Sequence, residues 1–381
     1  MKFLFFVVAI LMLINLEAQN MTLKGKVYDA SNNEPLSFAS IYFNSTTNGT
    51  ISDENGEFSI PFNPNFTELI VSFLGYDPIS HQVEIDQANR IHSFYLSPSE
   101  QILETVKIKS KRDKAWYHNL NLFKSQFIGT SKNAEKTKIL NEESIYFSYD
   151  KKTKILKAFS REPLKIDNDA LGYNIKYDLV EFTYDVKNGT CLFLGYPQYE
   201  NKDEEPKKKW LKARKKAYLG SFLHFSQAMV AGISESEGFE VRNLVRKENR
   251  KERLNDEVNF NTATIRISPE INSNQNADML EGKTFDPFQK LNREEEIYTL
   301  ELSNLWQITY TKEKPDKNYH PNALKRRSRS SGKIQTSVLH LMDEKAEFNS
   351  AGIIIDPLDV LVEGYWSHEK LADMVPLDYN L

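Results

Sequence analysis

Cysteine is almost absent from this sequence, with Cys191 the single example among 381 residues. An intramolecular disulfide framework and a Cys-x-x-Cys metal or redox site each need at least two thiols, so both are excluded. Glycine and proline are also sparse, at 15 and 14 residues, which excludes a linker-rich or collagen-like chain. Stability must therefore come from the packing of apolar side chains.

Motifs that hold nucleotides, metals or a catalytic serine are also missing. The chain contains no Gly-x-Ser-x-Gly, no P-loop, no His-Glu-x-x-His and no Gly-x-Gly-x-x-Gly pattern. The seven histidines are scattered along the chain: His81, His92, His118, His224, His320, His340 and His368. We therefore expect no cofactor and no metal, and the sequence favours a protein without catalysis.

What is present is typical of globular domains. Hydrophobic residues make up 40% of the chain and charged residues 27%, and at roughly 150 residues per domain the length predicts two domains. The net charge of −4 is unevenly divided. Residues 20–98 hold three basic and nine acidic side chains, a balance of −6, which leaves +2 for residues 99–381. The sequence thus predicts an acidic head and a slightly basic body.

The first nineteen residues have the pattern of a secretory signal peptide. Lys2 precedes twelve apolar residues, Phe3–Ile14, fewer than the ~18–20 residues that span a bilayer. We expect cleavage near Ala18 or Gln19 and a mature chain without a transmembrane segment. An exported chain without disulfides indicates a bacterial envelope, and we expect this protein in the periplasm or associated with the outer membrane.

Residues 20–98 predict an all-β head. Short alternating or β-branched runs are separated by turn residues. The expected strands are 23–28, 38–43, 56–60, 69–73, 79–85 and 91–96, with a possible seventh at 105–108. Six or seven strands at about ten-residue spacing are typical of a small sandwich.

The head contains a set of short motifs in one fixed order. They are Gly25-x-Val27-x-Asp29, Glu34-Pro35-Leu36-x-x-Ala39-x-Ile41, Gly49-Thr50-x-x-Asp53-x-x-Gly56-x-Phe58 and Gly75-Tyr76. In this it resembles the carboxypeptidase-like regulatory domain, a transthyretin-like β-sandwich, and the N-terminal extension of TonB-dependent receptors of Bacteroidota. The resemblance implies a scaffold or interaction module. It does not imply peptidase activity, because the metallocarboxypeptidase catalytic domain is not in this chain.

Two patterns in the head imitate metal sites. His81-x-x-Glu84 has the spacing of a zinc-binding pair, but residues three apart in a strand point to opposite faces. Asp53-Glu54-Asn55-Gly56 resembles part of a calcium loop, but the distal bidentate glutamate is missing. We interpret the first as a structural or surface pair and the second as a turn.

Residues 99–112 are the predicted linker, and residues 113–381 are predicted to form a β-rich α+β body. Helices are expected at 113–127 and 205–230, strands at 144–149, 155–159, 173–184, 191–196, 239–246, 297–311, 334–342 and 351–366, and polar loops at 250–296 and 312–332. The fold class is therefore α+β overall, with an N-terminal all-β transthyretin-like or immunoglobulin-like sandwich.

The body carries one cluster that could bind a ligand. The residues are Arg214, Tyr218, Ser221 and His224, whose spacings of four, three and three place them near one helix face. One interpretation is a Ser221–His224 nucleophile and base, or an anion gripped by Arg214 and His224. The other, which the sequence favours because no third residue orients the histidine, is that the tyrosine is core and His224 is a hydrogen-bonded buried group.

The body as a whole, including this cluster, carries a second resemblance. The matching motifs are Ile139-x-Asn141, Leu164-x-Ile166-x-Asn168-x-x-Leu171-Gly172-Tyr173, Gly195-Tyr196, Arg214-x-x-x-Tyr218-x-Gly220-Ser221-x-x-His224-Phe225, Gly364-Tyr365-Trp366 and Asp378-Tyr379. The body resembles an uncharacterised module of secreted Bacteroidota proteins. This resemblance implies an architecture and a compartment, but no reaction.

Basic residues are concentrated in two stretches of the body. Residues 207–253 hold thirteen basic and five acidic side chains, and Lys325-Arg326-Arg327-x-Arg329 adds a second cluster. Such a surface could hold anionic glycans or lipid headgroups, although a solvated helix face is the simpler interpretation. Export argues against nucleic acid as a partner.

Three hypotheses follow. The favoured one is an exported envelope protein that binds or assembles with an envelope protein or glycan through its sandwich head. The alternatives are an uncharacterised envelope hydrolase with a site around Ser221 and His224, and a purely structural envelope component.

Overall fold

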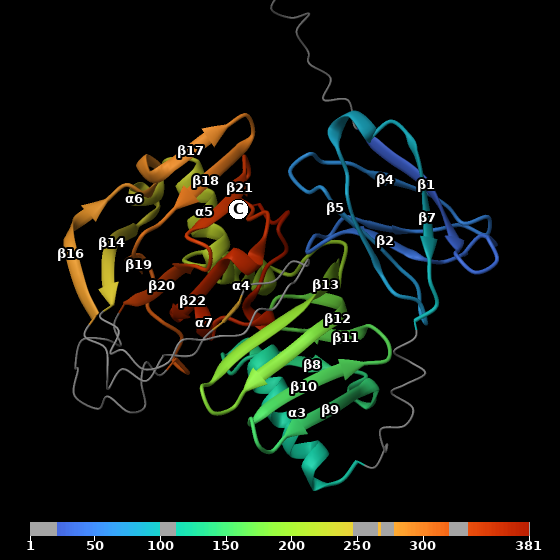
Figure 1. Ribbon diagram of the computed structural model, residues 1–381, viewed down its shortest axis with the longest axis horizontal. Coiled ribbons are helices and arrows are strands. Elements are labelled where there is room, and N and C mark those ends of the chain that lie inside the picture. The colour runs from blue at the N-terminus through green and yellow to red at the C-terminus, as the bar shows by residue number, and fades with distance from the viewer. Residues whose placement is uncertain (1–20, 100–111, 247–265, 268–277, 320–333, 381) are drawn as a thin grey trace, which may run out of the picture.

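The computed structural model describes residues 21–99, 112–246, 266–267, 278–319 and 334–380 (Figure 1). An N-terminal β-sandwich is followed by a larger α+β body that is rich in strands. The predicted fold class is therefore confirmed.

The head is built from seven described strands. They are β1 (Thr22–Asp29), β2 (Ser40–Phe43), β3 (Gly49–Ile51), β4 (Glu57–Pro61), β5 (Glu68–Ser72), β6 (Ile79–Gln82) and β7 (Ile91–Leu96). One sheet has the order β4-β1-β7 and the other β3-β2-β5-β6. All six principal strands were predicted, and the short strand β3 was missed. The possible strand at 105–108 lies outside the described residues.

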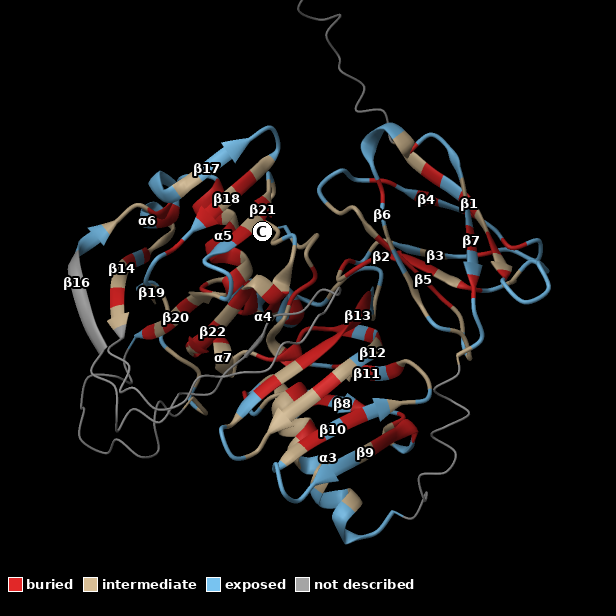
Figure 2. Cartoon of the chain, in the orientation of Figure 1, coloured by how far each residue is buried: buried red, intermediate tan, exposed pale blue. Residues whose placement is uncertain are grey.

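Alternation along each strand builds the core of the head. In β1, Leu23 and Val27 are fully buried, whereas Lys24 is exposed on the opposite face. Figure 2 shows buried and more exposed stretches following one another along the strands of the head. Gly25 lies on the same inward face, and glycine is required there because a Cβ would lie 2.6 Å from the carbonyl oxygen of His92. The apolar faces of the two sheets therefore pack against each other and form the core of the head.

The body contains the helices and the remaining strands. The helices are α3 (Lys114–Phe127), α4 (Lys208–Tyr218), α5 (Phe222–Val230), α6 (Ser234–Glu237) and α7 (Tyr365–His368). The strands are β8 (Thr137–Ile139), β9 (Ile145–Asp150), β10 (Ile155–Ser160), β11 (Leu164–Asn168), β12 (Tyr173–Asp185), β13 (Thr190–Asn201), β14 (Phe239–Arg246), β15 (Arg266–Ile267), β16 (Asp278–Phe285), β17 (Leu291–Glu294), β18 (Ile297–Glu301), β19 (Leu305–Tyr310), β20 (Gln335–Leu341), β21 (Lys345–Asn349) and β22 (Val360–Gly364). Short 3₁₀ turns occur at Ile85–Gln87, Ala134–Lys136, Glu142–Ser144, Pro287–Lys290, Pro357–Asp359 and Leu371–Asp373.

Twelve of the described body strands form one sheet. Its main path is β16-β14-β19-β20-β22-β15-β13-β12-β10-β9, with β11 and β8 attached beside β12. A second sheet has the order β17-β18-β21. Helix α3 begins where predicted, because the Asp113 carboxylate caps it by accepting hydrogen bonds from the backbone N–H groups of Ala115 and Trp116.

The long helix predicted at 205–230 is wrong, because the chain breaks there into α4 and α5. Gly220 between them has φ +82°, a conformation that disfavours other residues. Ser221 then caps α5 by accepting a hydrogen bond from the His224 backbone N–H. A left-handed glycine followed by a serine N-cap is a local stop and start signal, which the apolar stripe across 210–229 concealed.

The loop predicted at 250–296 is also partly wrong, since strands β15, β16 and β17 lie inside it. Strand β17 was missed because three of its four residues are exposed, so it lacks the apolar alternation by which a strand is recognised. Its pairing with β18, rather than its own composition, makes it a strand.

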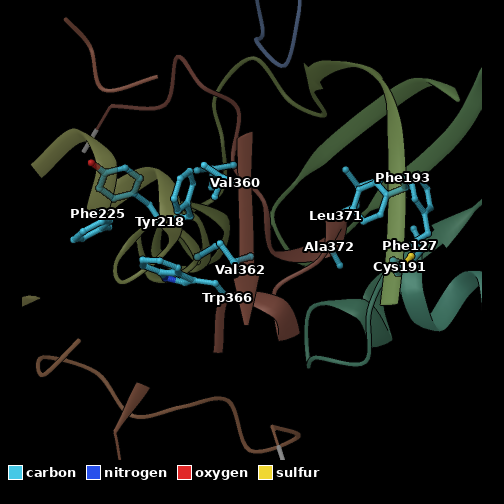
Figure 3. Packing of buried hydrophobic residues seen from close by; sticks show 14 of the residues in the cluster. Phe127, Cys191, Phe193, Tyr218, Phe225, Val360, Val362, Trp366, Leu371 and Ala372 are labelled. Atoms are coloured by element: carbon cyan, nitrogen blue, oxygen red, sulfur yellow. The ribbon is translucent and has the colours of Figure 1, made fainter. Parts of the chain in front are cut away.

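The body has one large apolar core shared by its strands and helices. Figure 3 shows Tyr218, Phe225 and Trp366 gathered beside Val360 and Val362 of β22, with Phe127, Cys191 and Phe193 on the other side of that strand. Cys191 is a free and fully buried thiol, and it acts here as a small apolar side chain.

Candidate functional site

Arg214 is buried in α4 and its guanidinium is bound to the backbone. Nε donates to the carbonyl oxygen of Leu171 (2.7 Å) and Nη2 donates to that of Gly172 (3.0 Å). The guanidinium carbon lies 3.8 Å from the centre of the Tyr173 ring. Burial lowers the pKa of Arg214 below its usual value. This side chain fixes the turn between β11 and β12, and its donors are directed into the protein.

His224 is buried in α5 and both of its ring nitrogens face protein groups. Nδ1 accepts a hydrogen bond from the Gly220 N–H (3.0 Å), so the proton of the neutral ring belongs on Nε2. That atom lies 3.3 Å from Oε2 of Glu237. Burial lowers the pKa of His224, partly opposed by Glu237. The histidine therefore joins the break between the helices to α6.

Tyr218 completes the cluster, and burial raises its pKa to about 12. Its hydroxyl donates to Oε1 of Gln227 (2.6 Å), and its ring packs on those of His224 and Tyr379, at centroid distances of 4.8 and 5.5 Å. Gln227 and Glu237 were missed by the sequence analysis, which named Tyr379 only as part of the Asp378-Tyr379 motif. Gln227 lies nine residues along the chain from Tyr218, beyond the reach of spacing rules within one helix.

Ser221 and His224 do not have the geometry of a nucleophile and its base. The Ser221 hydroxyl accepts from the His224 backbone N–H (3.2 Å), and the ring nitrogens are directed to Gly220 and Glu237. A catalytic pair requires a hydrogen bond between the hydroxyl and a ring nitrogen. The structure thus brings Tyr218, Ser221 and His224 together, with their polar groups used to hold α4, α5 and α6, whereas the Arg214 guanidinium is bound at the turn between β11 and β12.

Replacing Ser221 by alanine tests this capping role. We expect Ser221→Ala to lower the free energy of unfolding by about 1 kcal/mol, because the first turn of α5 loses its N-cap. Ser221→Asn should recover most of the loss, since asparagine is an equally good cap. Chemical denaturation of both variants is the measurement. Equal losses in the two variants would contradict the capping role.

The recess beside this cluster is small. It is lined by Gly220, Phe239, Ile308, Tyr310, Gln335, Ser337 and Trp366, and its empty volume is about 150 Å³. Pockets for small molecules usually hold about 300–1,000 Å³. Its residues form the packing surface under the break between α4 and α5, where a Cβ on Gly220 would lie 2.4 Å from Oε1 of Gln335.

The two metal-like patterns of the head adopt local structures. His81 lies in β6, whereas Glu84 lies beyond the end of that strand, before a 3₁₀ turn. The Asp53 carboxylate accepts hydrogen bonds from the backbone N–H groups of Asn55 and Glu57 (both 2.8 Å), which is an Asx turn. Within the described ranges, no group of three or more His, Cys, Asp or Glu side chains has metal-binding geometry.

We expect the His81 ring to make the stability of the head depend on pH. It lies 5.7 Å from the ring of His92 and 5.5 Å from that of Phe94, and burial and His92 lower its pKa. The unfolded chain, with a histidine pKa of about 6.5, then binds protons more readily than the folded chain. We expect the free energy of unfolding to fall as the pH decreases below about 6.5.

Replacing His81 by phenylalanine should reduce this dependence, because the ring packing is kept and the titrating group is removed. Thermal unfolding between pH 7.5 and 5 is the measurement. His118, exposed on α3, supplies the matched control His118→Phe. An unchanged pH slope in His81→Phe would show that another group is responsible.

The head is docked against the body through the outer face of its four-stranded sheet. Tyr42 of β2 and Ile70 of β5 form a buried apolar cluster with Tyr196 of β13. The Tyr42 hydroxyl donates to Oδ2 of Asp178 (2.9 Å) and also lies 3.0 Å from the Tyr196 carbonyl oxygen. Burial raises the pKa of Tyr42 well above its usual value, so the hydroxyl remains a donor.

Backbone hydrogen bonds extend this junction along the loop after β2. The Ser45 N–H donates to the Pro197 carbonyl oxygen (2.9 Å) and the Tyr199 N–H donates to that of Thr46 (3.0 Å). The C-terminal segment adds the Leu377 N–H, which donates to the Ser45 carbonyl oxygen (2.8 Å). Side chains and backbone from three separate parts of the chain thus hold the head.

The sequence contained a signal for this junction. Ile41-Tyr42-Phe43 and Leu69-Ile70-Val71 are runs of three consecutive apolar residues, and successive residues of a strand face opposite sides. Such a run indicates a strand covered on both faces. It shows that the outer face is buried, but it does not show what covers it.

The comparisons with known proteins agree with the family predicted for the head. Residues 23–108 match the CarboxypepD_reg-like domain family. The predicted carboxypeptidase-like regulatory domain is therefore confirmed for this part of the chain. Its match extends past Pro98 into residues 100–108, which lie outside the described structure.

Beyond the CarboxypepD_reg-like domain the comparisons carry no functional argument. No curated protein matches the chain. Among solved structures, a 9R-lipoxygenase from Cyanothece PCC8801 is 11% identical, with a TM-score of 0.17. The alignment covers 59% of this chain and 49% of the lipoxygenase. No helix within the described residues is both long and apolar enough to cross a membrane.

Proposed function

We propose that this chain is an exported cell-envelope protein whose CarboxypepD_reg-like head serves binding or assembly. The observation that carries the proposal is the match of residues 23–108 to that domain family, a sandwich that supplies surfaces rather than reacting groups. In this proposal the partner is an envelope protein or glycan, and the chain acts without a cofactor.

The docking of the head on the body supports the idea that the two domains act together as one binding unit. Tyr42, Ile70 and Tyr196 bury the outer face of one sheet of the head, so a partner has access only to the rest of its surface. Preorganised surfaces bind more tightly, because less conformational freedom is lost on association. The unit would thus present the head and body to a partner in one fixed arrangement.

The envelope location rests on the first nineteen residues. Lys2 and the apolar run Phe3–Ile14 have the pattern of a cleaved leader. We propose a Bacteroidota host, with the mature protein in the periplasm or peripheral to the outer membrane. The resemblance of the head to the N-terminal extension of TonB-dependent receptors supports this choice.

Crosslinking in the native host tests the proposal. The tagged protein would be crosslinked in intact cells, purified from the envelope fraction and analysed by mass spectrometry. We expect the mature chain to begin near residue 19 or 20 and to carry one partner in stoichiometric amount. A tagged chain in the cytoplasmic fraction, or one without an enriched partner, would contradict the proposal.

Two control variants make this experiment specific. Ile70→Asp places a charge in the junction between head and body, so we expect it to weaken partner capture if the docked unit is the binding species. Ile91→Asp introduces the same charge at a position that is 81% exposed. Equal capture by both variants would show that the docked arrangement is not required.

A further inference from the structure

One end of the docked sheet of the head carries exposed apolar side chains. Phe38, Ile51 and Leu74 are 62%, 57% and 64% exposed. Ser40 pairs with both Ile51 and Ser72, so the start of β2 and the ends of β3 and β5 lie together. Phe38 and Leu74 are two residues beyond this row. Ile51, opposite Ser40, shares the face that the body covers at Tyr42. The three side chains of Phe38, Ile51 and Leu74 are here called the apolar end.

Phe38 is held in an unfavourable backbone conformation. Its φ is +63°, which is rare for a bulky residue without a glycine's freedom. Its N–H donates to the Ser52 carbonyl oxygen (3.1 Å), and its ring is directed to solvent rather than to the core. A strained backbone that exposes an aromatic ring does not stabilise the head. We therefore interpret the Phe38 ring as available for contact with another molecule.

Exposed acidic residues lie close along the chain to the apolar end. Each of its three members has an exposed acidic residue within four positions in the sequence: Glu34, Asp53, Glu54 and Asp77. The basic residues Lys24, Lys26 and Arg90 belong to β1 or precede β7, in the other sheet. The segments that carry the apolar end are therefore negatively charged.

Helix α4 has the complementary surface. Its exposed residues are Lys208, Lys209, Leu211, Lys212, Lys215 and Lys216. Leu211 is 47% exposed and lies on one helix face with Lys208 and Lys215, at spacings of three and four. This face, here called the basic face, is apolar at its centre and positive around it.

We propose that the basic face of α4 in one copy of this chain binds the apolar end of the head in a second copy. Both surfaces are exposed in the docked chain, so neither covers the other within one molecule. The contact uses two different surfaces, and such heterologous contacts form rings or open chains. This inference rests on the proposed assembly function and names its partner.

The charges near the apolar end favour the basic face of α4 as its partner over an anionic membrane or a second apolar end. Anionic membranes would be repelled by Asp53 and Glu54 beside the apolar end. A symmetric contact between two apolar ends would place the same acidic residues against each other, which is unfavourable at low ionic strength. The basic face offers both an apolar side chain and positive charge. In the proposed contact, Leu211 lies against Phe38 and the lysines lie against the acidic residues near the apolar end.

Sedimentation velocity of the purified protein tests the contact. We expect the average sedimentation coefficient to rise between about 1 and 200 μM protein in 50 mM salt, and the association to weaken about tenfold or more in 500 mM salt. Phe38→Asn and Leu211→Gln should each weaken association about tenfold. Asparagine tolerates positive φ and glutamine is a good helix former, so both variants should fold.

Mixing the two variants gives the sharpest result. Phe38→Asn keeps an intact basic face and Leu211→Gln keeps an intact apolar end. At a concentration between the dissociation constant of the wild type and the roughly tenfold weaker one of the variants, each variant alone should be mostly monomeric. An equimolar mixture should then form mainly a one-to-one dimer, with few larger species. Ile91→Asn, on the other sheet of the head, and Tyr117→Gln, on α3, are matched controls that should associate like the wild type.

Several outcomes would overturn the inference. A monomer at every concentration would do so, as would equal association of all variants or a mixture that behaves as the two variants do separately. Cosedimentation with anionic phosphatidylglycerol vesicles that Phe38→Asn abolishes would assign the apolar end to lipid instead. None of these outcomes decides the crosslinking result in cells, so the two proposals can fail independently.

Discussion

Ile70→Asp is expected to separate the unfolding of the head from that of the body. Ile70 is fully buried between Tyr42 and Tyr196, and a carboxylate in that position would be desolvated without a partner. We expect a loss of about 3–5 kcal/mol from the docked state. Calorimetry should show one transition for the wild type and two for the variant, because the head keeps its own core.

Solution scattering gives an independent measurement of the same change. The radius of gyration of Ile70→Asp should increase as the head moves away from the body. Ile91→Asp is the control, since the same charge at an exposed position should change neither the transition nor the radius. One transition with an unchanged radius in Ile70→Asp would mean that the backbone bonds of Ser45 and Thr46 are sufficient for docking.

Arg214→Met is expected to destabilise the body severely. The substitution keeps an unbranched chain of similar length, but it leaves the carbonyl oxygen of Leu171 without its donor and removes the cation from the Tyr173 ring. The Gly172 carbonyl oxygen loses one of two donors, since it also accepts from the Lys202 N–H (3.1 Å). One buried carbonyl left unsatisfied costs about 1–3 kcal/mol, and with the lost cation–π contact we expect a total loss of about 2–4 kcal/mol. Urea denaturation should show a lower midpoint with an unchanged slope.

Arg214→Lys and Lys216→Met distinguish shape from charge. Lysine carries the charge but lacks the planar fork that reaches two carbonyls at once, so Arg214→Lys should recover only part of the loss. Lys216 is exposed on the same helix, and Lys216→Met should change stability by less than about 0.5 kcal/mol. A wild-type midpoint in Arg214→Met would restore the hypothesis that this arginine grips an external anion.

The cluster around His224 shows how much of a site could be predicted from the intervals between residues in the sequence. The intervals between Arg214, Tyr218, Ser221 and His224 placed the four side chains near one face of a single helix. The chain breaks into α4 and α5 there, and only Tyr218, Ser221 and His224 lie together. Their partners were not predictable in the same way. Glu237 and Gln227 belong to the following helical segments, and Leu171 is 43 residues from Arg214. The residue types suggested a possible site, and the partners make the cluster part of the scaffold.

The sequence by itself determined the parts of this protein that depend on neighbouring residues. Period-two alternation placed the six principal strands of the head, and Asp113 marked the start of α3. The ordered glycine, proline and aromatic motifs of the head indicated its family. These features depend on steric and hydrogen-bonding preferences that act over a few residues.

Only the tertiary structure decided which distant segments cover one another. Tyr42 and Tyr196 are 154 positions apart, and no local preference relates them. The apolar runs in β2 and β5 required a cover on both faces, but many surfaces could have satisfied that requirement, because apolar burial is not directional. The cover was selected by the joint fit of β13, the loop after β2 and the C-terminal segment, which come together only when the whole chain has folded.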